Sequence, residues 1–259
     1  MAMGNNIAHT LNHSPFARRL QNCGGMADAD LGALDGIHQD LVRLGKGETL
    51  ATAGHAPDRI LVIEDGWAFR FQLLDDGGRQ ITEILAPGDM LNCEALSRLS
   101  PGHAAEALTP VTMRAFQAQE FLKTVQTTPG IAAALWWSEF QIDNMLREQI
   151  TRLGRRDAQS RIAHFFLELL MRARCAGVIR GGMIEAPLSQ SHLADLLGLT
   201  PVHVSRTLRR LNGMVKWTRR SVCVTDEDAL CRVAGFDAAY LNLQNYAKYR
   251  MRGQQAVAE

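Results

Sequence analysis

The chain has 259 residues and a net charge of +1, and 46% of its residues are hydrophobic while 21% are charged. This composition is typical of globular proteins and excludes a disordered or fibrous chain, and no apolar run approaches the roughly 18 residues that a membrane span requires. The charge is divided unevenly, because residues 1–150 carry 11 basic and 18 acidic side chains (−7) whereas residues 151–259 carry 17 and 9 (+8). These numbers predict two domains in a cytoplasmic protein that does not contact a membrane.

The five cysteines are scattered along the chain and include no CxxC or CxH pair. An odd number of cysteines without paired spacing argues against a disulfide framework and against a zinc site. The same pattern fits a reducing compartment. We therefore expect no metal ligands among the cysteines.

Residues 1–28 are rich in Asn, His and Gly and are predicted to form a flexible N-terminal arm. Residues 29–128 then show short apolar stretches that end in turn signals. Asp65-Gly66 and Asp76-Gly77 supply the positive φ angles that tight hairpins need. Closely spaced short strands joined in this way predict an antiparallel barrel or jelly roll.

A long amphipathic helix is predicted for residues 129–154. Its apolar positions recur at intervals of seven, four, four and three residues and so lie on one stripe. A helix with so much apolar surface needs a partner, which is either the β domain, a second copy of the chain in a dimer, or both. The stripe consists of Leu135, Ile142, Leu146, Ile150 and Leu153.

Two short helices are predicted inside the segment 155–235, where they form a helix-turn-helix. Ser189 is suited to cap the first helix and Gly198 to end it in a left-handed turn. Thr200 is suited to cap the second helix, and Pro201 then takes the first helical position, where a missing N–H costs nothing. Leucines on both helices supply the small core between them.

The outer face of the second helix is predicted to carry basic, hydroxyl and small apolar side chains. Between residues 200 and 220 the chain has six basic residues and no acidic residue. Arg binds guanine N7 and O6, Ser binds phosphate or base, and a small aliphatic group contacts the thymine methyl. The residues predicted to read bases are Val202, Ser205, Arg206 and Arg209. The residues predicted to contact the DNA backbone are Ser189, Gln190, Thr200, His203, Arg210, Arg219 and Arg220.

The residues of segment 214–230 alternate in character as in a short β-hairpin. This hairpin would place Arg219-Arg220 at the tip of a wing. Residues 236–259 are predicted to form a C-terminal helical extension, to which no role is assigned.

The order of these parts resembles the CRP/FNR family of bacterial transcription regulators. "LGKGETLATAGHAPDRILVIEDGWAFRF" (44–71) and "ITEILAPGDML" (81–91) are similar to the family's β-roll, and "LSQSHLADLLGLTPVHVSRTLRRL" (188–211) is similar to its DNA-binding motif. The resemblance implies an α+β chain with a cyclic-nucleotide-binding-like β-roll (jelly roll) as sensor, a long dimerisation helix and a winged helix-turn-helix. It implies a homodimer that binds an inverted repeat of double-stranded DNA, contacts RNA polymerase, and responds to a small-molecule effector if it responds to any.

Departures from the family pattern argue against its known effectors. Asn92-Cys93 stands where cyclic-nucleotide binders have Gly-Glu, and residues 100–107 offer no arginine for a cyclic phosphate, so cyclic AMP is not expected. Only Cys23 precedes residue 90, and Met113 stands at the roll position of the fourth cluster ligand, so a 4Fe–4S cluster is not expected either. No cofactor is predicted, although haem stays open, and Asn92 and Cys93 are the candidates for the effector loop.

Val202 is a further departure, because many members of the family carry a glutamate there that accepts a hydrogen bond from cytosine. Valine cannot accept this bond, so the half-site should differ from the family's usual one at that base pair.

Two alternative functions remain: a haem- or redox-responsive regulator of the same architecture, and a cupin-like metalloenzyme. The second has little support, since residues 44–120 contain only His55 and His103 and no third ligand in phase.

Overall fold

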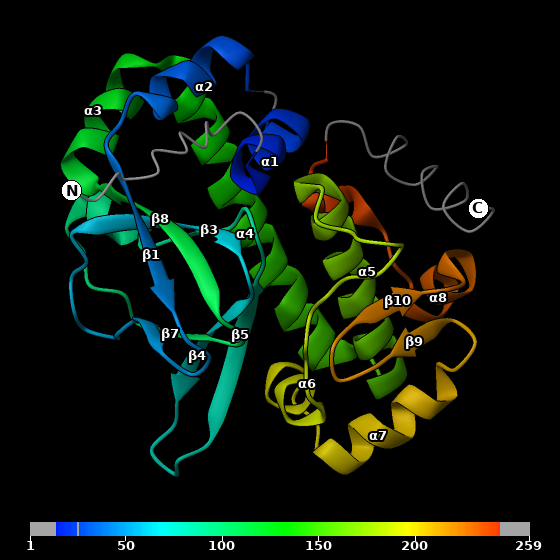
Figure 1. Cartoon of the computed structure of the whole chain (residues 1–259). Coiled ribbons are helices and arrows are strands. Elements are labelled where there is room, and N and C mark those ends of the chain that lie inside the picture. Colours follow the sequence, from blue (N-terminus) through cyan, green and yellow to red (C-terminus); the bar gives the residue numbers. More distant parts are fainter. Residues whose placement is uncertain (1–13, 25, 244–259) are drawn as a thin grey trace, which may run out of the picture.

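The computed structural model describes residues 14–24 and 26–243, and it divides into a β-rich N-terminal part, a long helix and a C-terminal part that is mainly helical (Figure 1). This arrangement confirms the α+β class, the roll, the long helix and the winged helix-turn-helix. No helix within the described ranges is long and apolar enough to cross a membrane.

The roll consists of two four-stranded antiparallel sheets, with strand orders β1-β8-β3-β6 and β2-β7-β4-β5. Their strands are β1 (Gln39–Leu44), β2 (Thr49–Ala51), β3 (Arg59–Asp65), β4 (Ala68–Leu73), β5 (Arg79–Leu85), β6 (Met90–Leu91), β7 (Ala104–Ala107) and β8 (Val111–Gln117). Gly66 turns between β3 and β4 with φ +90°, and a Cβ there would lie 2.3 Å from the Pro110 carbonyl oxygen, so only glycine fits.

Alternation along the strands creates a core on each side of the roll. Leu61 and Ile63 of β3 point between the two sheets, whereas Ile60 and Val62 pack against helices that cover the first sheet. These helices are α1 (Pro15–Gly24), α2 (Asp28–Asp35), α3 (Ala118–Thr127) and α4 (Pro129–Arg155), and the short η2 (Cys93–Ser97) follows β6. Both faces of the middle of β3 are buried, and the sequence is continuously apolar there, from Ile60 to Ile63.

The prediction of a flexible arm over residues 1–28 was wrong for its described part. From Ser14 onward the chain forms α1, whose Phe16 and Leu20 are fully buried against the roll and α4. The Ser14 hydroxyl accepts a hydrogen bond from the Ala17 amide at 3.0 Å and so caps the helix. Polar composition suggested an arm, but two large apolar side chains on one helical face are sufficient to anchor it. Residues 1–13 lie outside the described ranges.

The C-terminal part is built on α5 (Ala158–Ala176), whose side chains are buried on most sides. Its other elements are α6 (Gln190–Leu197), α7 (Pro201–Arg210), β9 (Val215–Trp217), β10 (Val222–Val224), α8 (Glu227–Ala234) and η3 (Ala238–Leu241). Its core is continuous with Phe69 and Phe71 of β4 and Ile81 and Ile84 of β5. The roll and the C-terminal part therefore share one apolar core along the second sheet.

The long helix α4 buries one face inside the protomer and exposes another. Leu135 is buried against the roll, and Ile142 and Leu153 are half-buried, whereas Leu146 and Ile150 are exposed. The stripe predicted from the sequence is therefore split between two faces, and Leu135 is not available to a partner. The exposed apolar side chains, which we call the outer stripe, are Trp136, Phe140, Leu146 and Ile150.

The division of α4 into faces was missed because its buried face is partly polar. Ser138, Gln141, Gln149 and Arg152 are all less than 9% exposed. Such residues are buried only when hydrogen-bonded, and their partners lie far away in the sequence. Gln141, for example, donates to the Leu241 carbonyl oxygen at 2.7 Å.

Two further expectations were corrected or left open by the structure. Cys175 of α5 is disulfide-bonded, which the scattered cysteine spacing did not predict, because spacing reports only on local pairs. In place of the helical extension expected from residue 236, the described part contains only the short 3-10 helix η3, which packs on α4. The remainder of that extension, residues 244–259, lies outside the described ranges.

Candidate nucleic-acid interface

The helix-turn-helix is held by caps that the sequence predicted. The Ser189 hydroxyl accepts from the His192 amide at 3.1 Å, and the His192 ring nitrogen accepts from the Ser189 amide at 3.2 Å, which completes a capping box. Gly198 ends α6 with φ +62°, and the Thr200 hydroxyl accepts from the His203 amide at 3.2 Å at the start of α7. The three-residue turn therefore forms as predicted.

The helix α7 presents a basic and apolar face to solvent. Val204 and Leu211 are fully buried, and Thr207 is 2% exposed and donates from its hydroxyl to the His203 carbonyl. On the opposite face Val202 is 61% exposed. His203, Arg206, Arg209 and Arg210 are also exposed, and Ser205 is half-buried. The predicted base-reading residues thus occur together on a surface that a ligand can reach.

The wing is a two-stranded antiparallel hairpin of β9 and β10. At its tip the Thr218 amide donates to the Ser221 carbonyl at 2.9 Å, and the Thr218 hydroxyl accepts from the Arg220 amide at 3.1 Å. Arg219 and Arg220 are both exposed at this tip. The hairpin therefore presents two cations on a tight, hydrogen-bonded turn.

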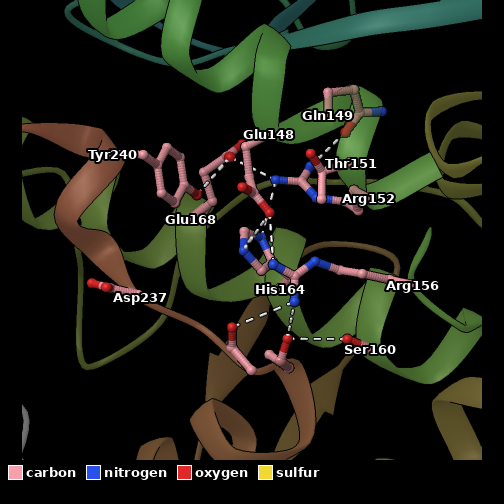
Figure 2. Close-up of polar contacts among 12 residues, drawn as sticks. Glu148, Gln149, Thr151, Arg152, Arg156, Ser160, His164, Glu168, Asp237 and Tyr240 are labelled. Carbon is pink, nitrogen blue, oxygen red and sulfur yellow. Dashed lines mark hydrogen bonds and ion pairs between the residues drawn. The ribbon is translucent and has the colours of Figure 1, made fainter. Parts of the chain in front are cut away.

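A buried polar network holds the elbow between α4 and α5, and Figure 2 shows its members. The Arg152 guanidinium, 1% exposed, donates to Glu168 at 2.6 Å and to the Gln149 side chain at 2.6 Å. Glu168 also accepts from the Tyr240 hydroxyl at 2.8 Å. This network connects the last turns of α4, the middle of α5 and η3.

His164 lies at the centre of the network as a neutral ring. Burial, and then the charges of Arg152 and Arg156, lower the pKa of His164 to about 3. Its Nδ1 lies 3.2 Å from the Arg152 guanidinium, which can only donate, so its Nε2 carries the hydrogen and donates to Glu148 at 3.2 Å. Arg156 pairs with Glu148 at 2.7 Å and also donates to the Ala234 carbonyl at the end of α8. The elbow is therefore fixed by groups on four elements.

The effector-loop candidates are Asn92, which follows β6, and Cys93, which is the first residue of η2. Asn92 is 8% exposed, and its backbone has a left-handed conformation with φ 65°, which asparagine tolerates better than most residues. Burial, and then the neighbouring carboxylate of Glu139 on α4, raise the pKa of the Cys93 thiol. A protonated thiol is a poor metal ligand and a poor nucleophile, so this environment does not favour a redox or haem-ligand role for Cys93.

The interior of the roll does not fit the phosphate of a cyclic nucleotide. Arg70, a largely buried arginine of β4, is paired with Glu83 and donates to the Met90 carbonyl at 2.9 Å, so its guanidinium is already engaged. Burial lowers the pKa of His103, which lies 3.9 Å from Glu94. The carboxylates of Glu83 and Glu94 and the neutral imidazole of His103 would repel a phosphodiester or bind it poorly.

A second ionic cluster, which the sequence did not reveal, joins the roll to α5. Asp89, in the Pro-Gly-Asp turn, pairs with Arg172 of α5 at 2.5 Å and with Arg19 of α1 at 3.2 Å. These charges hold the pKa of the Asp89 carboxyl below its usual range, although its burial acts in the opposite direction. The turn motif predicted only local geometry, because its two cationic partners lie more than 60 residues away.

Comparison with protein families matches both parts of the chain. Residues 41–128 match the cyclic nucleotide-binding domain, and residues 160–233 match the Crp-like helix-turn-helix domain.

In the described residues, no group of three or more His, Cys, Asp and Glu side chains is arranged to hold a metal ion.

Relatives are found among bacterial regulators of transcription. The transcriptional activatory protein AadR of Rhodopseudomonas palustris is 31% identical over 195 residues, which is 75% of this chain and 80% of that protein. The transcriptional activator protein FnrL of Cereibacter sphaeroides is 31% identical over 201 residues, covering 74% and 79%. The structure of FixK2 from Bradyrhizobium japonicum superposes with a TM-score of 0.69 at 26% identity, covering 78% of this chain and all of that one. These relatives are regulators and not enzymes, which leaves the metalloenzyme alternative without support.

Proposed function

Because this chain belongs to the CRP/FNR family of transcription regulators, we propose that it binds an inverted-repeat operator as a homodimer, with one α7 in the major groove at each half-site. The observation that carries this proposal is the exposed outer face of α7, where valine, serine and two arginines stand opposite a buried apolar face. Two such helices one DNA turn apart, roughly 34 Å, select a two-fold symmetric site.

Each part of the chain has a proposed role. Residues 29–128 are the sensor domain, 129–154 the dimerisation helix, and 155–235 the DNA-binding domain. The base-reading residues are Val202, Ser205, Arg206 and Arg209, and the backbone contacts are Ser189, Gln190, Thr200, His203, Arg210, Arg219 and Arg220. The protein would act in the cytoplasm beside RNA polymerase, and any effector is a small molecule other than a cyclic nucleotide.

The outer stripe of α4 supports the dimer. Trp136, Phe140 and Ile150 are 70%, 60% and 72% exposed, which is unusual for three large apolar side chains on one helix. Their spacing of four and ten residues places them along one side of the helix, where a second copy of α4 can pack. Of the residues predicted from the sequence to dimerise, Leu146 and Ile150 belong to this surface.

Selection of bound sequences from random DNA tests the proposed function. We expect an inverted repeat whose half-sites are centred about one helical turn apart. We also expect a base other than the family's usual one at the position that Val202 faces. Recovery of single half-sites, or of no common sequence, would contradict the proposal.

Replacing Arg206 with alanine should weaken binding to the selected operator by about 1–3 kcal/mol and relax the preference at one base pair, because a bidentate contact to guanine is lost. Fluorescence anisotropy on the operator and on single-base variants measures both effects. Arg232→Ala on α8 removes the same charge from an exposed position outside α7 and is the control. Equal losses on operator and random DNA would argue that Arg206 contacts phosphate instead.

Replacing Arg219 and Arg220 together with alanine should weaken binding to all sequences alike, because the wing is proposed to contact phosphates. The slope of log K against log salt concentration should become shallower by about 1 to 2, according to whether one or both arginines release a counterion. Titrations at a series of salt concentrations measure this slope. An unchanged slope, or a change in base preference, would be inconsistent with a backbone role.

A further inference from the structure

The roll contacts the helix-turn-helix through the first residues of β5, and Figure 1 shows β5 beside α6. Arg79 donates from Nε and from a terminal nitrogen to one carboxylate oxygen of Asp195, at 3.0 and 2.8 Å. The guanidinium also lies 4.9 Å from the ring centre of Phe69 and 5.8 Å from that of Phe71. An arginine held by a carboxylate and two aromatic faces has little freedom to move.

Gln80, the next residue, binds the backbone of α6. Its side-chain amide donates to the Asp195 carbonyl at 2.7 Å and to the Leu196 carbonyl at 3.3 Å. The last carbonyls of a helix have no donors within the helix, so they need partners from elsewhere. Here one of those partners comes from a strand more than 100 residues earlier in the chain.

Two other side chains complete the attachment of this helix end. Gln149 of α4 donates to the Leu196 carbonyl at 2.6 Å, and Arg161 of α5 donates to the Leu197 carbonyl at 3.1 Å. The roll, the long helix and the DNA-binding domain thus all hold the same turn of α6. Only residues 198–200 separate this turn from α7, so its position determines the position of α7.

The covalent link between α4 and α5 does not by itself determine where the DNA-binding domain lies. The backbone leaves the helical conformation at Arg156 (φ −87°, ψ 145°), and α5 begins after Asp157. A change of backbone angle at such an elbow would turn α5 relative to α4, and α6 and α7, which pack on α5, would move with it. Non-covalent contacts must therefore keep the domain in place.

We propose that Arg79 and Gln80 are positioning residues for DNA binding: they hold α6, and with it α7, at one place relative to the roll and α4. In a dimer joined through α4, this place sets the distance between the two copies of α7 and so the spacing of the operator half-sites. The inference rests on the proposed function, since it requires a dimer and a two-fold symmetric operator.

The experiment compares the wild-type protein with Arg79→Ala/Gln80→Ala on a series of DNAs. These are the selected inverted repeat, repeats whose spacer is one or two base pairs longer or shorter, and a single half-site. We expect the variant to bind the best-spaced repeat roughly tenfold more weakly, because the correctly placed state becomes a minority. Its affinities across spacers should converge to within about threefold, and its affinity for the single half-site should stay unchanged.

Arg43→Ala, which removes an exposed arginine from β1, is the matched control and should behave as wild type. Arg79→Lys should recover part of the spacer preference, since lysine keeps the charge but not the two-nitrogen contact. If the double variant keeps the wild-type spacer preference, or loses equal affinity on half-site and repeat, the positioning role is refuted. If the wild type itself shows no spacer preference, the dimeric operator is refuted and this inference with it.

Discussion

Replacing Phe140 and Ile150 together with lysine should convert the proposed dimer to a monomer and lower the affinity for the inverted repeat by at least about a hundredfold. Both residues belong to the outer stripe and are 60% and 72% exposed in the protomer, so the replacement does not disturb the protomer's own core. In a two-fold dimer each lysine faces the same surface of its partner, and the contact loses apolar area while it gains like charges. Binding of the second half-site then ceases to be intramolecular.

Sedimentation equilibrium and anisotropy on the inverted repeat measure these two effects. Leu41→Lys/Leu73→Lys changes two leucines of the roll that are 53% and 68% exposed, and it should leave both measurements unchanged. The affinity for a single half-site should be the same in all three proteins, because α7 is unaltered. A variant that stays dimeric at micromolar concentration would show that a different surface joins the protomers.

Replacing Arg152 with alanine should lower the free energy of unfolding by about 3–5 kcal/mol, because it leaves a buried carboxylate without its cationic partner. Among the described residues, Glu168, which is 5% exposed, would keep only its hydrogen bond from Tyr240, and the Gln149 side chain would lose its donor. The His164 ring would also lose the group that donates to its Nδ1. Arg152 and His164 are each 1% exposed, so the groups left unpaired would lie away from the protein surface.

Urea unfolding monitored by circular dichroism measures this loss. Arg147→Ala is the control on the same helix, because Arg147 is exposed and pairs with Asp143 one turn away, so its removal should change stability little. Arg152→Met/Glu168→Leu should recover a large part of the lost stability by replacing the ion pair with apolar groups of similar size. A loss below about 1 kcal/mol for the single variant would mean that the network is not important for stability.

The caps and turns of the helix-turn-helix could be predicted from the sequence because each of them depends on residues within four positions. Ser189, Gly198 and Thr200 take the conformations expected of them, and the buried leucines follow the 3.6-residue period. The resemblance to a family, carried by the same residues, correctly predicted the roll, the long helix and the class of function. The caps and turns are local features, because the residues that stabilise them lie next to them in the sequence.

The positions that were missed depend on contacts between distant segments. The segment of α1 packs as a helix because a surface is available to it between the roll and α4. That surface cannot be inferred from amino-acid composition. The inward face of α4 was missed because its glutamines and arginine are buried only in the presence of partners on α5, α6 and η3. The spacing of apolar residues does not reveal a buried polar face whose side chains form long-range hydrogen bonds.

By itself, therefore, the sequence determined the β-roll, the long helix, where α6 and α7 begin, and that α7 exposes a face carrying Arg206. Tertiary structure alone decided which side of α4 stays exposed for a partner, and that Arg79 and Gln80 of the roll hold the end of α6. The reason is physical: capping and periodicity act over a few residues, whereas burial and ion pairing depend on which surfaces meet after the chain has folded.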